Sequence, residues 1–160
     1  MPAPYDSRSI ANEILRIAKN DSKPLTIMQL IKLVYLAHGY SLGILGIALS
    51  KHEAQAWQYG PVMAPVYKSF KGAGAQPLSS FAIDKSTGLP FRDEFSSQEL
   101  EILQGIVDTY GGRHAFELSD MLHQADEPWT IVFNRDGAYS PIPNELIRQD
   151  FQKLIAPANG

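Results

Sequence analysis

The chain has 160 residues, contains no cysteine, and has a formal net charge of −3 with its 14 basic residues scattered. This length suits one domain that folds without a disulfide or metal, and the lack of cysteine excludes thiolate metal sites and cysteine nucleophiles. Because the basic residues form no cluster and no stretch approaches the roughly 18 apolar residues of a membrane span, we expect a cytoplasmic protein that binds neither nucleic acid nor membrane.

Helix signals dominate the N-terminal part of the chain. Residues 7–19 repeat apolar side chains at helical spacing and predict a first helix. Thr26 and Gln29 form a capping box, which marks the start of a second helix. That helix is apolar nearly all round, so we expect it to be the buried central helix, ending within residues 38–43.

The middle of the chain is less regular. Two short segments, 46–50 and 53–57, are expected to be the strands of a small hairpin. Pro61 is expected to restart a helix for one turn, and Pro65 to begin a second helical piece, because proline suits a first helical turn. Residues 72–94 are rich in glycine, serine and proline and are expected to form a loop.

Helices return in the C-terminal part. A capping box at residues 96–99 predicts a helix that ends at Gly111, and further helices are expected near 115–124, 128–134 and 143–155. The side chains expected to face the core are Leu100, Leu103, Val107, Tyr110, Leu118, Met121, Leu122, Ile147, Phe151, Leu154 and Ile155. The expected fold class is mainly α (α+β): one compact helical domain over 1–160, with its core in 6–156, about five to seven helices and a small β-hairpin or minor sheet.

The candidate chemical groups do not assemble into a catalytic pattern. The chain has four histidines, at His38, His52, His114 and His123. Their spacing matches no metal-binding motif, so we expect His38 and His123 to cap or pack near helix ends and the other two to lie in turns. We therefore predict a non-enzymatic protein with no catalytic residue, no metal ligand and no cofactor. One alternative stays open, a metal-dependent hydrolase that uses His38 and His123.

Residues 53–70, EAQAWQYGPVMAPVYKSF, concentrate aromatic side chains. Trp57 and Trp129 are expected to pack in the core, because each can bury a large area. Tyrosine beside a Gly-Pro turn keeps its hydroxyl in water and is enriched at protein interfaces. We predict a partner-binding surface around Tyr59, Met63, Tyr67 and Lys68, together with exposed parts of the 72–90 loop.

Three motifs resemble a known family over about residues 8–135. The segments LIKLVYLAHGYSLGILGIAL (30–49), EAQAWQYGPVMAPVYKSFK (53–71) and LSDMLHQADEPW (118–129) are similar to the Panacea family, also described as SocA-like antitoxins or GepA-like phage-associated proteins. Either Glu53 or Gln55 fills the acidic position of the middle motif. The motif residues that we expect to hold the fold are Tyr35, His38, Gly39, Trp57, Gly60, Pro61, Pro65, His123, Pro128 and Trp129.

The resemblance implies an antitoxin of a toxin–antitoxin system. Members of this family neutralise a cognate toxin by direct protein–protein binding, so the implied partner is a toxin protein. A SocA-like branch works as a proteolytic adaptor that delivers its toxin to ClpXP, which makes ClpX a second implied partner. A phage-encoded interaction protein without a toxin is the remaining alternative.

Overall fold

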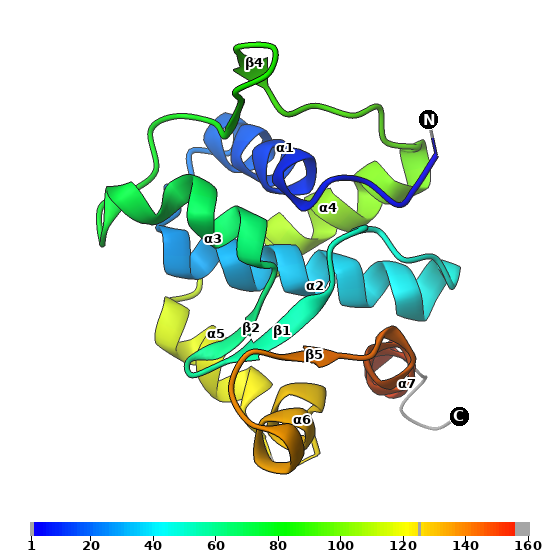
Figure 1. The fold of residues 1–160 in the computed structure, drawn as a ribbon. Helices are drawn as coiled ribbons and strands as arrows, with labels where there is room; N and C mark the ends of the chain where they lie inside the picture. The colour runs from blue at the N-terminus through cyan, green and yellow to red at the C-terminus, as the bar shows by residue number, and fades with distance from the viewer. Residues whose placement is uncertain (1, 125, 156–160) are drawn as a thin grey trace.

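The computed structural model describes residues 2–124 and 126–155, so the ends of the predicted 1–160 domain and of its 6–156 core, with residue 125, lie outside the described part. Within it the chain is mainly helical with a minor sheet, which confirms the predicted fold class (Figure 1). The helices are α1 (Ser7–Asn20), α2 (Ile27–Leu45), α3 (Ala64–Phe70), α4 (Ser97–Tyr110), α5 (Ala115–Leu122), α6 (Pro128–Asp136) and α7 (Asn144–Ile155), with a 3-10 turn at Lys71–Ala73. The strands are β1 (Ala54–Trp57), β2 (Gly60–Val62), β3 (Ile83–Asp84), β4 (Leu89–Pro90) and β5 (Ser140–Ile142).

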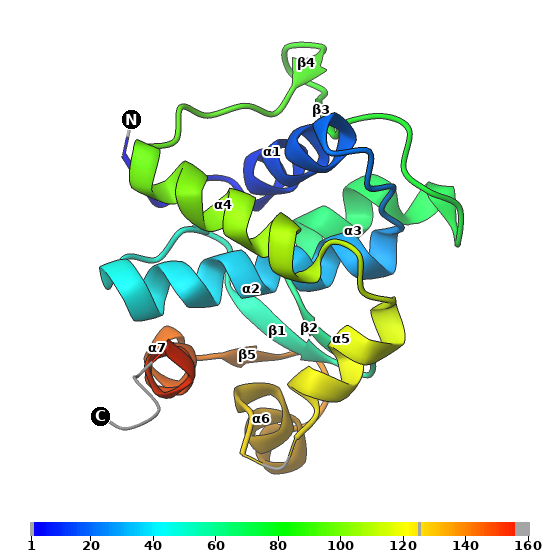
Figure 2. The ribbon, with the colours of Figure 1, turned by 180° about the vertical axis from the view of Figure 1, so that it is seen from behind.

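Helix α2 runs through the middle of the molecule. The helices α1, α3 and α4 lie on one side of it, and the sheet with α5, α6 and α7 lies on the other (Figures 1 and 2). The capping box of Thr26 and Gln29 is present, as predicted. The helix ends later than predicted, at Leu45, because Gly46 supplies the left-handed C-cap with a φ of 69°.

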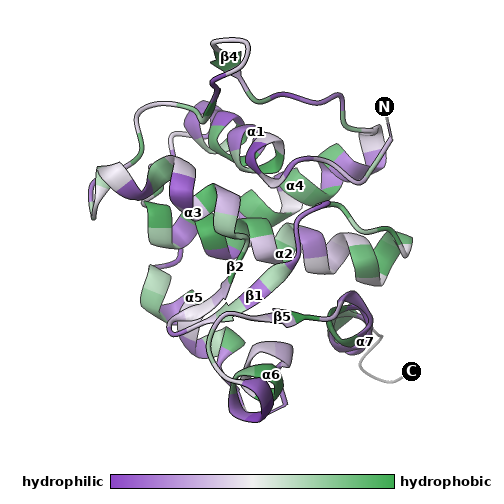
Figure 3. Cartoon of the chain, viewed as in Figure 1, coloured by the Kyte–Doolittle hydropathy of each residue, from purple (hydrophilic) through white to green (hydrophobic). Residues whose placement is uncertain are grey.

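By length and composition α2 could cross a membrane, contrary to the expectation that no stretch is apolar enough. However, 72% of its most apolar window is buried inside the fold. Apolar residues accordingly concentrate along α2, whereas the outer face of α7 is largely hydrophilic (Figure 3). The apolar character of α2 is therefore accounted for by its place in the core.

The sheet differs from the predicted hairpin. Strand β1 pairs with β2 through the two-residue turn Gln58–Tyr59, and not with residues 46–50. In the predicted strand 46–50, Gly46 caps α2, and Ser50 makes only an isolated parallel bridge to Tyr5. Two-residue loops are the commonest connections in antiparallel hairpins, which agrees with the pairing of β1 with the strand that directly follows it.

Proline occupies both outer strands of the three-stranded sheet, whose order is β2-β1-β5. Pro61 lies opposite Ala56, and Pro141 lies opposite Gln55. The prediction that Pro61 restarts a helix is wrong, because an edge strand tolerates the missing N–H that proline brings. The helix begins instead at Ala64, with Pro65 in its first turn.

The C-terminal helices follow the prediction, with three errors of burial. Leu103, Val107, Ile147 and Phe151 are buried as expected. Leu100, Leu154 and Ile155 are exposed, so their assignment to the core is wrong. Each of the three lies in a terminal turn of its helix, at the edge of the packed core.

The predicted loop 72–94 is partly ordered by a buried side chain of α1. It contains the two-stranded ribbon of β3 and β4. The amide of Asn12, fully buried, donates to the carbonyls of Ala82 at 3.0 Å and Phe91 at 2.9 Å, and its oxygen accepts from the Ala82 N–H at 2.8 Å. One asparagine therefore satisfies backbone groups on both arms of the ribbon.

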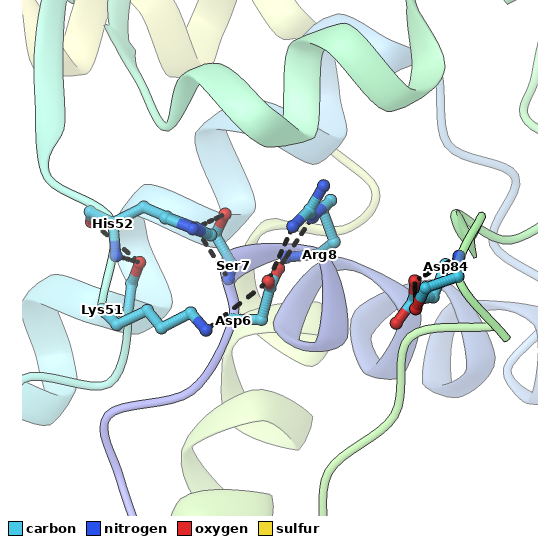
Figure 4. A network of polar contacts seen from close by, with 8 residues as sticks. Asp6, Ser7, Arg8, Lys51, His52 and Asp84 are labelled. Carbon is cyan, nitrogen blue, oxygen red and sulfur yellow. Dashed lines mark hydrogen bonds and ion pairs between the residues drawn. The ribbon is translucent and has the colours of Figure 1, made fainter.

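A polar network joins the start of α1 to the segment after α2 (Figure 4). Asp6 caps α1 by accepting from the Arg8 N–H at 2.9 Å, and it also pairs with the Arg8 guanidinium at 2.8 Å. The Ser7 hydroxyl lies 2.7 Å from Nδ1 of His52, and Lys51 reaches Asp6 at 3.9 Å. His52 thus ties residues 50–52 to α1, and its position in a turn agrees with the prediction.

Candidate functional site

The face that carries Tyr59 contains a cleft of about 360 Å³. We call it the aromatic cleft; its lining residues are Met28, Ile31, Trp57, Gln58, Tyr59, Val62, Tyr67 and Tyr139. None of these side chains is an acid or a base of the Asp, Glu, Lys, Arg or His type. Apolar clefts that carry a few hydroxyl and amide groups are typical binding sites.

Trp57 forms the central wall of the aromatic cleft, and three contacts orient its indole. Its ring packs edge-to-face against Tyr67 at 5.1 Å and against Tyr139 at 5.4 Å. Its Nε1–H donates to Oε1 of Gln55 at 2.8 Å. Gln55 therefore positions the tryptophan, whereas Glu53 is exposed. Such edge-to-face pairs add to the burial energy and hold the ring in one orientation.

Two tyrosines stand at the rim of the aromatic cleft. Tyr59 and Tyr139 are each 64% exposed. Tyr59 occupies the β1–β2 turn, where its carbonyl accepts from the Ser119 hydroxyl at 3.2 Å. Tyr139 has a φ of 66°, unusual for a residue with a side chain, and its N–H donates to the Ala56 carbonyl at 2.7 Å. Strained backbone of this kind clusters at binding sites, so Tyr139 is a candidate for contact on this ground, and Tyr59 is one by its exposure.

A stack of aromatic rings supports the hairpin from behind. The Nε1–H of Trp129 donates to the carbonyl of Trp57 at 2.6 Å. The Trp129 ring stacks on His123 at 4.0 Å and on Phe133 at 4.8 Å. His123 is the C-cap of α5, near a helix end as predicted, and His114 is the N-cap of the same helix rather than only a turn residue. Helices α5 and α6 therefore support the rim of the aromatic cleft through Ser119 and Trp129.

The structure brings together part of the predicted partner-binding surface. Tyr59 and Tyr67 line the aromatic cleft. Lys68 is exposed but lines a different hollow, beside β3. Met63 is 1% exposed, so its assignment to the surface is wrong. It caps α3, and the chain direction there turns its side chain into the core.

Sequence reasoning missed two kinds of residue in this cleft. Tyr139 lies more than 80 positions from Trp57 in the chain, and only the pairing of β5 with β1 brings it close. Met28 belongs to a helix that was correctly expected to be buried, and its half-exposure depends on where the hairpin ends. A positive φ could have been suspected near Gly137, which lies in a turn. No local signal marks either side chain as part of the site.

The motif residues of α2 make contacts inside the fold. His38 is fully buried, accepts from the Ser50 N–H through Nδ1 at 3.1 Å, and contacts Oδ1 of Asn144 through Nε2 at 2.9 Å. The ring of Phe151 occupies the place that a Cβ on Gly39 would need. His38 therefore lies inside a helix and not near its end, and both its nitrogens have protein partners. A hydrolase that uses His38 as a metal ligand would have to break these bonds.

Buried ionisable groups gather where α2 meets α5, α6 and α7. Burial lowers the pKa of Lys32, which is 1% exposed, to about 8. Burial and the nearby charge of Lys32 also lower the pKa of His123. Burial and the neighbouring Asp150 raise the pKa of Glu127 to about 8. Burial, with the charges of Glu127 and Asp150, raises the pKa of Tyr35.

Comparison with known proteins places this fold in a family. A family model described as "Antitoxin SocA-like, Panacea domain" matches residues 30–130. The protein "Antitoxin SocA" of Caulobacter vibrioides is 32% identical over 143 residues, which cover 85% of this chain and 74% of that protein. No solved structure gives a significant match. The resemblance inferred from the three motifs is confirmed: the chain belongs to the SocA-like antitoxin family with a Panacea domain.

Proposed function

We propose that this protein is a cytoplasmic antitoxin that neutralises a cognate toxin by direct protein–protein binding, and that the toxin engages the aromatic cleft. Family membership supports an antitoxin role. The observation that carries the choice of face is a pair of exposed tyrosines beside Trp57: Tyr59 in the β1–β2 turn, and Tyr139 directly before β5. Tyrosine and tryptophan supply much of the binding energy at protein interfaces, because they bury large area at low entropic cost.

The test is co-expression with the product of the neighbouring gene, followed by measurement of growth and of complex formation. Tyr59→Ala and Tyr139→Ala should each weaken binding by roughly tenfold or more, while the melting temperature changes little. Phe116→Ala is the matched control, because Phe116 is 77% exposed but lies on α5 outside the cleft. Equal losses for all three variants would refute the assignment of the face. If growth is rescued although no stable complex forms and the toxin is not lost, neutralisation by direct binding is refuted.

We also propose, from the family's SocA-like branch, that delivery to ClpXP is the route by which the bound toxin is removed. Delivery and simple occlusion differ in one measurement. Under delivery, the half-life of the toxin lengthens when ClpX is removed, whereas under occlusion it stays the same. The Tyr59→Ala variant should shorten the lag before toxicity in both cases, because both require the complex.

A further inference from the structure

Helix α4 has a second face besides the one that it turns to the core, and Figure 2 shows the molecule from the side on which α4 lies in front of α2. The core face carries Leu103 and Val107, which are fully buried. The second face recurs at helical spacings of three and four residues and consists of Gln98, Glu101, Ile102, Gly105, Ile106 and Thr109. These residues line a groove of about 380 Å³ between α4 and the last two turns of α2. Four of the six are exposed, so α4 presents a helix-packing face to solvent.

The centre of this face is open because it carries no side chain. Gly105 lies in the middle of α4, and in the described part of the chain no neighbouring atom comes within 4 Å of the place that its Cβ would take. Glycine weakens a helix, and neither a close contact nor a positive φ requires one at this position. A glycine does allow the backbone of another helix to approach closely. Gly105 therefore lies where a second helix can cross α4.

The two ends of the groove carry opposite charges. Of its lining residues, all in the described part of the chain, only Glu101 is of the Asp, Glu, Lys, Arg or His type, and it lies near the start of α4. Past the end of α4, the guanidinium of Arg113 lies 5.1 Å from the centre of the Tyr110 ring, and its charge acts on Tyr40. Both tyrosines line the groove. Because the helix rises by about 14 Å from Glu101 to Tyr110, the acid and the base lie at opposite ends of one face.

We propose that this face of α4 binds a second copy of the chain, with the two α4 helices antiparallel and crossing at Gly105. A twofold axis through the crossing brings the start of one α4 beside the end of the other. Because the side chain of Arg113 folds back over Tyr110, Glu101 of each copy then lies beside the guanidinium of the other copy. The twofold axis repeats this contact, so the interface contains two charge-assisted pairs.

The charge pattern selects this occupant and this direction. A face with one acid and one base is complementary to an identical face turned through 180°, whereas a helix with charges of a single sign would be repelled at one end. A parallel arrangement of two copies would place like charges side by side at both ends. The second copy also covers apolar surface in the groove, since Ile44 is 53% exposed and Ile102 is half-buried.

Sedimentation equilibrium of the full chain, from micromolar to millimolar concentration, tests the proposal. The wild type should show a reversible equilibrium between monomer and dimer. Glu101→Arg places two arginines at each contact and Arg113→Glu places two glutamates there, so each variant should weaken dimerisation by roughly tenfold or more. An equimolar mixture of the two variants restores opposite charges at both contacts and should dimerise about as tightly as the wild type. Misfolding of either variant cannot produce this recovery.

Gly105 provides a second test with two opposite readouts. Gly105→Ala adds a methyl group in open space, so it should raise the melting temperature at concentrations where the monomer prevails, because alanine favours a helix. The same methyl group lies at the crossing and should weaken dimerisation. Phe116→Ala is the matched control, since Phe116 is exposed but lies outside the groove, and it should dimerise like the wild type.

Three results would overturn the proposal. They are a wild type that stays monomeric throughout, a dimer that neither charge variant weakens, and a mixture of the two variants that does not recover. Unchanged dimerisation of Gly105→Ala would refute the crossing at this residue. None of these results affects the toxin-binding proposal, because the groove and the aromatic cleft share no lining residue.

Discussion

Replacement of Lys32 by methionine should stabilise this protein at neutral pH. Methionine has nearly the same length and shape but no charge, so it fills the same buried path along α2. The pKa of Lys32 is about 8 in the folded chain, against an ordinary value of 10.5. At ~1.36 kcal/mol per pKa unit, this difference corresponds to about 3 kcal/mol of destabilisation that the charged lysine imposes below pH 8.

The gain from the substitution should depend on pH in one direction. Between pH 8 and 10.5 the unfolded chain holds the Lys32 proton while the folded chain has released it. The free energy of unfolding of the wild type therefore rises with pH across this window, and the variant lacks that contribution. The gap between the two proteins should be widest below pH 8 and should close towards pH 10.5.

Urea unfolding at several pH values measures this gap. The exposed-site variant Lys68→Met should show no comparable gap at any pH, because its ammonium is hydrated. A Lys32→Met protein that is less stable than the wild type at pH 7 would refute the reasoning. A gap of constant size across the alkaline range would refute it as well, because the destabilisation would then not come from the charge.

Three further predictions concern the contacts around α2 and α7. His38→Leu should lower the free energy of unfolding by about 1–3 kcal/mol, because it leaves a buried backbone N–H without an acceptor; chemical denaturation measures it, and a neutral effect would contradict the role of the ring. Gly39→Val should lower the melting temperature more than Gly43→Ala does, because the Phe151 ring occupies the place that a Cβ on Gly39 would need. Equal melting temperatures of the two variants would refute this. Glu127 has a raised pKa, so its contribution to stability is present at acid pH and is lost as the pH rises towards 8. In Glu127→Gln, the free energy of unfolding should therefore change less between pH 5 and 8 than in the wild type. An unchanged slope of this free energy against pH would contradict the buried pairing with Asp150.

Features encoded within one turn of chain were predictable from the sequence. The capping boxes at Thr26 and Ser96 lie where the sequence places them, because each depends on residues three positions apart. The same holds for the extent of α1, expected over 7–19 and found over Ser7–Asn20, and for the end of α4 at Gly111. Local hydrogen-bond geometry decides such features, and no distant contact has to be known.

Features that depend on distant contacts were not predictable. The partner of β1 on one side is β5, more than 80 residues later, and this pairing places Tyr139 at the rim of the aromatic cleft. Pro61 carries a helix-start signal, yet the position of β2 at the edge of the sheet overrides it. Met63 was predicted to lie on the surface, but its side chain turns into the core where α3 begins. Tertiary packing overrides local preference in each of these cases.

The prolines in the two outer strands, Pro61 and Pro141, restrict how the sheet can grow. An added strand would meet a backbone position that cannot donate on either flank, so neither another copy nor a foreign polypeptide can readily extend the ribbon. Under the proposed function, the specificity for a toxin must therefore come from side chains on the surface and not from a strand added to the sheet. Under the proposed function, substitutions at the exposed Tyr59 or Tyr139 would change which toxin is bound and leave the fold intact.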